Sequence, residues 1–133
     1  MAARLARHGL PHHAACFFCD QAMETMEHIL VGCPFSRQVW QDCFSWCYPH
    51  ALAPTSSVRF LDWWHGATSA APTALRKGIA SLILLVAWLI WKHRNSCVFD
   101  GTPPSTSQLL HEIKEEARSW AKAGASGLAT LLP

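Results

Sequence analysis

The segment CFFCDQAMETMEHILVGC, residues 16–33, places three cysteines and one histidine in the spacing C-x2-C-x8-H-x4-C. Two thiols separated by two residues can turn back onto one ion, and a later histidine and cysteine complete a tetrahedral shell. The pattern predicts one structural Zn²⁺ bound by Cys16, Cys19, His28 and Cys33. Because protein fills all four positions of such a shell, the ion has no place for water or substrate. The site is therefore expected to shape the chain and not to perform chemistry.

Two stretches of this sequence resemble one known family. The first comprises RLARHGLP at 4–11, the cysteine pair at 16–19, ETMEHIL at 24–30 and GCPFSRQVW at 32–40, and the second is WLIWKHRNSCVFDG at 88–101. The first is similar to the reverse-transcriptase zinc-binding domain at the C-terminal end of plant LINE-type (non-LTR) retrotransposon polyproteins. The second resembles the segment W-x-I-W-K-x-R-N-x-x-x-F that follows it there. The resemblance covers most of residues 4–124 and implies a role with nucleic acid, because related retroelement proteins use cysteine and histidine knuckles on their RNA.

Length and composition favour one small intracellular domain. The chain has 133 residues, half of them hydrophobic, so it can supply a core. We expect a single domain over residues 1–133, with the zinc loop at 12–34, a helical part at 35–123 and a frayed tail at 124–133. The formal charge of +2 is too small to indicate nucleic acid by itself. No signal-peptide pattern follows Met1, so we expect reduced thiols and a nuclear or cytoplasmic protein that is not secreted.

Helical periodicity and capping residues predict an all-α fold. Thr25 is a candidate N-cap for a short helix that carries His28, and Pro34 suits the first turn of the next helix. Ser105 and Gln108 match the S-x-x-Q capping box, which predicts the start of the last helix. Helices are expected at residues 2–8, 34–48, 58–65, 72–99 and 105–123.

The apolar run at residues 79–91 could be mistaken for a membrane span. A spanning helix needs about 20 apolar residues, and shorter runs are more often core helices. Pro72 and the charged residues on both sides argue against extension to that length. We interpret the helix at 72–99 as a central strut that packs between the helices at 34–48 and 105–123, outside any membrane.

The charge of the zinc loop makes it a poor platform for phosphate. Between Cys16 and Cys33 the loop has acidic residues and no lysine or arginine, and zinc with three thiolates adds further negative charge. Phe17 and Phe18 could stack on unpaired bases, although for Phe17 packing over the metal is the favoured interpretation. The candidate nucleic-acid contacts are Arg4, Arg7, Phe18 and Arg37.

The remaining cysteines have simpler interpretations. Cys43 and Cys47 lie one helical turn apart, with His50 nearby, and could hold a second metal. Free cysteine is among the most buried residue types, so we interpret these two, together with Cys97, as core thiols. A redox role for the pair at 16–19 would need a thioredoxin-like strand and helix around it, and neither is readable.

We therefore expect a module without catalytic activity. The sequence has no paired aspartates of a polymerase palm, no RNase H carboxylate set and no Ser-His-Asp set. The expected function is accessory binding of nucleic acid or ribonucleoprotein, with RNA, single-stranded nucleic acid or another retroelement-derived protein as partner and no small-molecule substrate. The alternative is a protein interaction module that uses the long apolar helix and makes no direct contact with nucleic acid.

Overall fold

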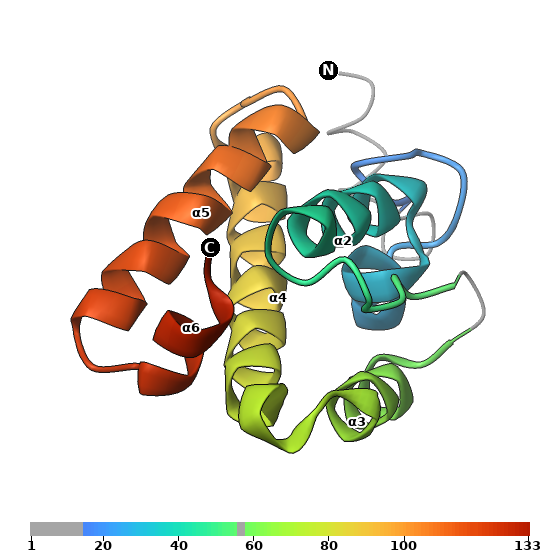
Figure 1. Cartoon of the computed structure of the whole chain (residues 1–133). Coiled ribbons are helices and arrows are strands. Elements are labelled where there is room, and N and C mark those ends of the chain that lie inside the picture. The colour runs from blue at the N-terminus through green and yellow to red at the C-terminus, as the bar shows by residue number, and fades with distance from the viewer. Residues whose placement is uncertain (1–14, 56–57) are drawn as a thin grey trace.

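The computed structural model describes residues 15–55 and 58–133, and over these ranges the chain is all-α, as predicted (Figure 1). One isolated bridge joins Ala15 and Met23, and no strand occurs in the described ranges. The helix expected at 2–8 lies outside the described residues. The elements are a π-helical turn η1 (His28–Gly32), α2 (Pro34–Cys47), α3 (Phe60–Ala70), a 3-10 turn η2 (Thr73–Leu75), α4 (Arg76–Phe99), α5 (Thr106–Lys122) and α6 (Ser126–Leu131).

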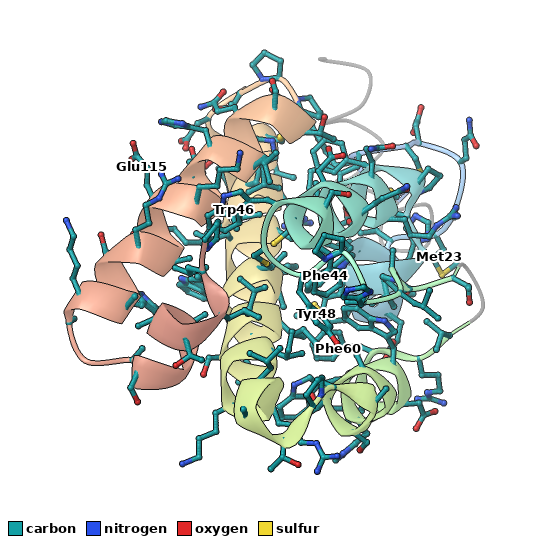
Figure 2. All side chains as sticks on the ribbon, in the orientation of Figure 1. Met23, Phe44, Trp46, Tyr48, Phe60 and Glu115 are labelled. Carbon is teal, nitrogen blue, oxygen red and sulfur yellow. The ribbon has the colours of Figure 1, made fainter. Side chains whose placement is uncertain are left out.

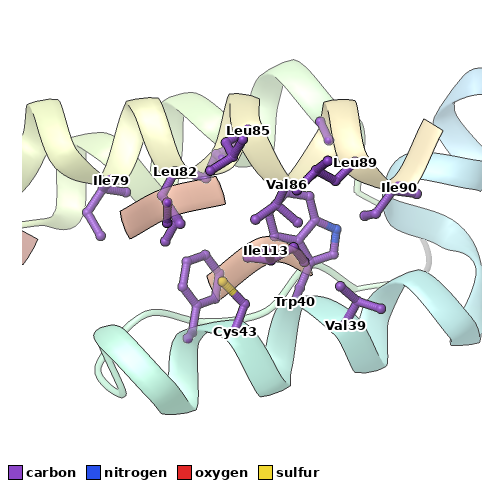
Figure 3. Packing of buried hydrophobic residues seen from close by; sticks show 14 of the residues in the cluster. Val39, Trp40, Cys43, Ile79, Leu82, Leu85, Val86, Leu89, Ile90 and Ile113 are labelled. Carbon is purple, nitrogen blue, oxygen red and sulfur yellow. The ribbon is translucent and has the colours of Figure 1, made fainter. Parts of the chain in front are cut away.

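The long helix α4 is the central strut of the fold. In Figure 1, α5 and α6 lie on one side of α4, and α2 and α3 lie on the other. Figure 3 shows Trp40 and Cys43 of α2 facing Leu82 and Val86 of α4, with Ile113 of α5 completing the cluster. Residues with helical spacing on three helices thus share one core, as their apolar stripes predict. However, α2 also packs directly against α5, so α4 does not separate these two helices as expected.

Local residues determine where three of the helical segments begin. Pro34 occupies the first turn of α2. Backbone N–H groups in a first turn have no acceptor within the helix, so proline, which lacks this group, costs no hydrogen bond there. The hydroxyl of Ser105 accepts a hydrogen bond from the backbone N–H of Gln108 at 3.1 Å and caps α5. The hydroxyl of Thr25 accepts one from the N–H of His28, also at 3.1 Å. All three predicted starts are confirmed.

The boundaries of α3 differ from the prediction. A helix was expected at 58–65, whereas α3 spans Phe60–Ala70. The carboxylate of Glu27 accepts a hydrogen bond from the N–H of Phe60 at 2.6 Å, so a distant acid satisfies a donor at the helix start. The indole of Trp63 then meets Trp40 edge-on, with ring centroids 4.6 Å apart. Figure 2 shows aromatic side chains, Phe60 among them, gathered between α2 and α3.

The prediction of a frayed tail at 124–133 is wrong. Residues Ser126–Leu131 form α6, which packs against α4 and buries Leu128 and Leu131. The two helices approach closely because their backbones touch at Gly78 and Gly127, which have no side chains. A Cβ on Gly127 would lie 2.9 Å from the backbone nitrogen of Gly78, and a Cβ on Gly78 would overlap the carbonyl oxygen of Gly127. The absence of a side chain at Gly127 and Gly78 therefore allows the two helices to touch.

The argument from length against a membrane span also fails. The continuous helical segment Thr73–Phe99 has 27 residues, and an apolar window of 18 residues within it has a mean hydropathy of 1.7, so by length and composition it could cross a bilayer. Pro72 precedes this segment and does not shorten it. In the fold, 44% of its apolar window is buried inside the protein. The interpretation as a core helix therefore rests on burial, and the absence of membrane contact stays a prediction.

Alanine substitutions at Leu82 and Leu84 distinguish a core helix from a lipid-facing one. Leu82 is 0% exposed and Leu84 is 48% exposed, although they lie two residues apart on α4. Leu82→Ala is expected to lower the free energy of unfolding by about 2–5 kcal/mol, and Leu84→Ala by under about 1 kcal/mol. Urea denaturation of both variants measures the difference. Equal small effects, with the chain recovered only from membranes, would contradict the core position of α4.

A second pair of substitutions tests the contact between α4 and α6. Gly78→Ala should destabilise the protein by about 1–3 kcal/mol, because the new methyl group meets backbone that cannot rotate away. Gly66→Ala in α3 is the matched control, since nothing lies within 4 Å of its Cβ position. It should be neutral or stabilising by up to about 1 kcal/mol from helix propensity. Thermal unfolding measures both, and a harmless Gly78→Ala would show that α6 does not pack as described.

Candidate metal centre

The four predicted ligands converge in space. The ligand atoms of Cys16, Cys19, His28 and Cys33 all lie within 4.8 Å of one another. The Sγ atoms of Cys16 and Cys33 are 3.7 Å apart, and the Sγ of Cys19 is 3.3 Å from Nε2 of His28. Typical Zn–S and Zn–N bonds, about 2.3 Å and 2.0–2.1 Å, place tetrahedral donors about 3.6–3.8 Å apart. The donor set and its dimensions therefore fit a zinc ion.

The first two ligands are positioned by a tight turn. The N–H of Cys16 donates to the carbonyl of Ala22 and the N–H of Asp20 donates to the carbonyl of Cys16, both at 2.7 Å. Asp20 has a φ of 57°, in the left-handed region that aspartate tolerates better than most residues. These bonds fold the loop back on itself and point both thiols of the C-x-x-C pair to one side.

The other two ligands bracket the turn η1. His28 opens η1, and the N–H of Cys33 at its end donates to the carbonyl of His28 at 2.7 Å. Cys33 is also the N-cap of α2, and its carbonyl accepts the N–H of Arg37 at 2.9 Å. The buried hydroxyl of Ser36 donates to the carbonyl of Ile29, which fastens α2 to the turn. One ligand thus joins the metal loop rigidly to the helical core.

The opposite pKa shifts of Cys16 and Cys33 favour a bound cation between them. Contact with the Cys33 thiol lowers the pKa of Cys16 to about 5, while burial opposes that shift. The same contact, together with burial, raises the pKa of Cys33. Two adjacent buried thiols cannot both ionise on their own, because like charges disfavour each other. A divalent ion among the four donors would hold both as thiolates, so the chemistry of the site agrees with its geometry.

A carboxylate links the metal loop to α4. Glu24 accepts a hydrogen bond from the N–H of Phe17 at 3.1 Å, and its other oxygen forms an ion pair with Arg94. The guanidinium of Arg94 also donates to the side chain of Asn95 at 2.9 Å and lies over the ring of Trp91 at 5.1 Å. The ion pair is mostly buried, so it is screened less than a surface pair. Sequence reasoning missed this role of Glu24 and Arg94.

His93 provides a second support for the loop. Its ring stacks on Phe35 with centroids 5.8 Å apart, and Phe35 stacks on Phe18 at 4.2 Å. Nε2 of His93 accepts the N–H of Ser105 at 3.2 Å. Burial lowers the pKa of His93, partly opposed by the charge of Glu112, and the neutral ring suits this apolar stack. His93 and Arg94 of the second motif thus support the metal loop, whereas Trp88 and Phe99 in the same motif stay exposed.

The candidate nucleic-acid contacts are divided between described and undescribed residues. Arg4 and Arg7 lie outside the described residues. Phe18 is half-buried, and Phe35 covers one face of its ring. Arg37 donates from Nε to the carbonyl of Gly32 at 3.3 Å. Both Phe18 and Arg37 therefore have structural roles at the loop, and Phe17, which is fully buried, is closed to bases.

The other cysteines do not form a second metal site in the described part of the chain. Cys43 and Cys97 are buried, and Cys47 is half-buried. The thiol of Cys47 donates to the carbonyl of Cys43 at 3.3 Å, as thiols on a helix commonly do. His50 is exposed and belongs to no group of three or more metal-ligating side chains among the described residues.

Comparison with known proteins agrees with this site. Residues 1–40 match the family described as zinc-binding in reverse transcriptase, and the match includes all four ligands. It supports a reverse-transcriptase zinc-binding domain at this end of the chain. No curated protein and no solved structure matches the chain.

Zinc content and its loss on substitution test the ligand set. The protein should bind one Zn²⁺ per chain, measured by native mass spectrometry, and Cys33→Ser should abolish stoichiometric binding. Cys97→Ser is the matched control, because Cys97 is also buried but lies outside the four-ligand group. Structural zinc in finger peptides contributes about 10–16 kcal/mol of apparent binding energy, so chelation should unfold the loop. Full zinc occupancy in Cys33→Ser would contradict the assignment.

Proposed function

We propose that this chain is a non-catalytic zinc module derived from the reverse transcriptase of a plant LINE-type retrotransposon, with an accessory role in binding RNA or single-stranded nucleic acid. The observation that carries the proposal is the four-ligand cluster inside the segment that matches zinc-binding in reverse transcriptase. Such a site organises a fold, and the resemblance to a reverse-transcriptase domain suggests nucleic acid as the partner of that fold.

The closed shell of the metal supports the non-catalytic part of the proposal. Catalytic zinc keeps a position open for water or substrate, whereas here four protein donors meet. His93, the buried histidine of the described residues, accepts a backbone N–H and is stacked on Phe35, so its ring is engaged. The zinc ion would hold the loop against α2 and α4 and leave binding to surrounding surfaces.

Charge decides where nucleic acid could bind. The sequence has eleven lysines and arginines and nine acidic residues; without Arg4 and Arg7, nine cations remain in the described ranges against the same nine acids. These formal charges cancel, so the described residues offer no general attraction to phosphate. Binding therefore requires a local group of cations.

A second candidate function is supported by exposed apolar residues on α4. Leu84 and Trp88 lie one helical turn apart and are 48% and 55% exposed, and Phe99 beyond them is 76% exposed. Large apolar side chains exposed in a row are typical of protein interfaces. In this alternative the chain docks on another retroelement-derived protein without touching nucleic acid.

The two functions separate in a binding titration. Fluorescence anisotropy with a labelled single-stranded RNA, at salt concentrations from about 50 to 200 mM, should give binding that weakens steeply with salt. Leu84→Ser with Trp88→Ser should leave that binding unchanged within about twofold, because neither residue carries charge. Absence of binding even at the lowest salt would contradict the nucleic-acid function. Binding that ignores salt and disappears in the double variant would favour the protein interface.

A further inference from the structure

We propose that the phosphate-binding surface is the flank of α5 that carries Lys114, Arg118 and Lys122, positioned by Trp46 of α2, and that its ligand is the backbone of a single-stranded nucleic acid. The inference rests on the proposed function and adds the location of the binding surface. It differs from the sequence-based candidates, which flank the zinc loop.

The three cations form a regular row. They are four residues apart along α5, so each is displaced from the next by about 6 Å at a rise of 1.5 Å per residue. Arg118 and Lys122 are exposed and Lys114 is half-buried. No carboxylate lies within 4.0 Å of any of the three charged groups in the part of the chain that the structure describes. Successive phosphates of a nucleic-acid strand have a spacing of the same order.

Trp46 holds the first two cations in place. Nζ of Lys114 lies 5.6 Å from the centroid of its ring, and Cζ of Arg118 lies 5.5 Å from it. Like charges four residues apart on a helix repel each other by a few tenths of a kcal/mol. The indole offsets this repulsion by cation–π attraction and orders two flexible side chains before any ligand arrives. Figure 2 shows Trp46 reaching from α2 toward α5.

Glu112 and Glu116 of α5 lie on a different flank, and Glu115, three residues before Arg118, lies at the boundary between the two flanks. Glu112, Glu115 and Glu116 line a cavity of about 400 Å³ between α4 and α5. Glu115 also pairs with His111 at 3.0 Å, and Figure 2 shows it on the side of α5 away from α2. A helix with balanced charge thus has a basic flank toward α2 and an acidic flank toward α4. This separation produces a local positive field where the total charge predicts none.

A polyanion with repeated charges suits this row better than a folded acidic partner. Each cation can neutralise one phosphate and release a counterion. The ligand needs only negative charges at a regular spacing to match the row. Another copy of this chain could also offer its own acidic flank to the row. Self-association is therefore a competing outcome that the experiment must separate.

The experiment compares two triple variants that lose the same charge. One carries Lys114→Gln, Arg118→Gln and Lys122→Gln, and the control carries Arg59→Gln, Lys77→Gln and Lys92→Gln, three exposed cations on other segments. The affinity of the full-length zinc-loaded protein for single-stranded RNA is measured against salt. The α5 variant should bind at least about tenfold more weakly at low salt, and its log–log salt slope should fall by about 2, from three phosphate contacts at about 0.7 each. In the control variant, the changes in RNA affinity and in salt slope should each be less than about half of those in the α5 variant.

Each other result overturns the proposal in a recognisable way. If wild-type protein binds and the α5 variant binds equally well, the surface is wrong and the proposed function stands. Equal losses in both variants would mean that only total charge matters. If wild-type protein does not bind, the proposed function fails, and this surface fails with it. Sedimentation would identify self-association instead: in that case the wild-type protein is a dimer, the α5 substitutions make it a monomer, and RNA binding is unchanged.

Trp46 is a positioning residue in this scheme and has its own test. Trp46→Leu keeps apolar volume but removes the π face, so RNA affinity should fall about threefold or more with zinc content and salt slope unchanged, because the number of phosphate contacts is the same. Trp46→Phe should restore most of the affinity. Equal binding by the leucine and phenylalanine variants would show that the indole only packs.

Discussion

The carboxylate of Glu24 receives two bonds that join the halves of this molecule. One comes from the backbone N–H of Phe17, inside the metal loop, and the other from the guanidinium of Arg94 on α4. The stack of Phe18, Phe35 and His93 and the bond from Phe60 to Glu27 also fix this region to the helices, but neither involves the charge of Arg94. Through the two bonds to Glu24, the side of the loop that holds the C-x-x-C pair is tied to the central strut, and the charge of an acidic loop is partly neutralised at the same time. Zinc, by this account, orders the loop, and Glu24 and Arg94 place it.

That link also gives physical meaning to the second motif. Ile90 lies in the core, His93 stacks on Phe35, and Arg94 pairs with Glu24, so one helical turn and its neighbours connect the core to the metal loop. The other side of the same motif holds Trp88 and Phe99, which contact solvent. The segment therefore combines residues that support the loop with residues that have no structural task in the described fold. The exposed ones are the residues available for a partner.

Local chemistry made much of this structure predictable. The spacing of the ligands, the proline at the start of α2 and the cap at Ser105 act within a few residues, and the structure agrees with each of them. The start of α3 depends on Glu27, 33 positions away, and α6 depends on a contact between Gly78 and Gly127. Neither contact leaves a periodic signal in the sequence. The basic row on α5 was readable from its four-residue spacing, but a total charge of +2 concealed it.

The large apolar surface of α4 has a consequence for the order in which the chain folds. On a ribosome α4 is complete before α5 and α6 exist, so the faces that they cover are open to water during synthesis. In that state a helix with an 18-residue window of mean hydropathy 1.7 attracts chaperones, other nascent chains and lipid. The metal loop, α2 and α3 precede α4 and can cover its other side at once. Zinc supply during translation would then determine how much of this helix is already sheltered when its last turn emerges.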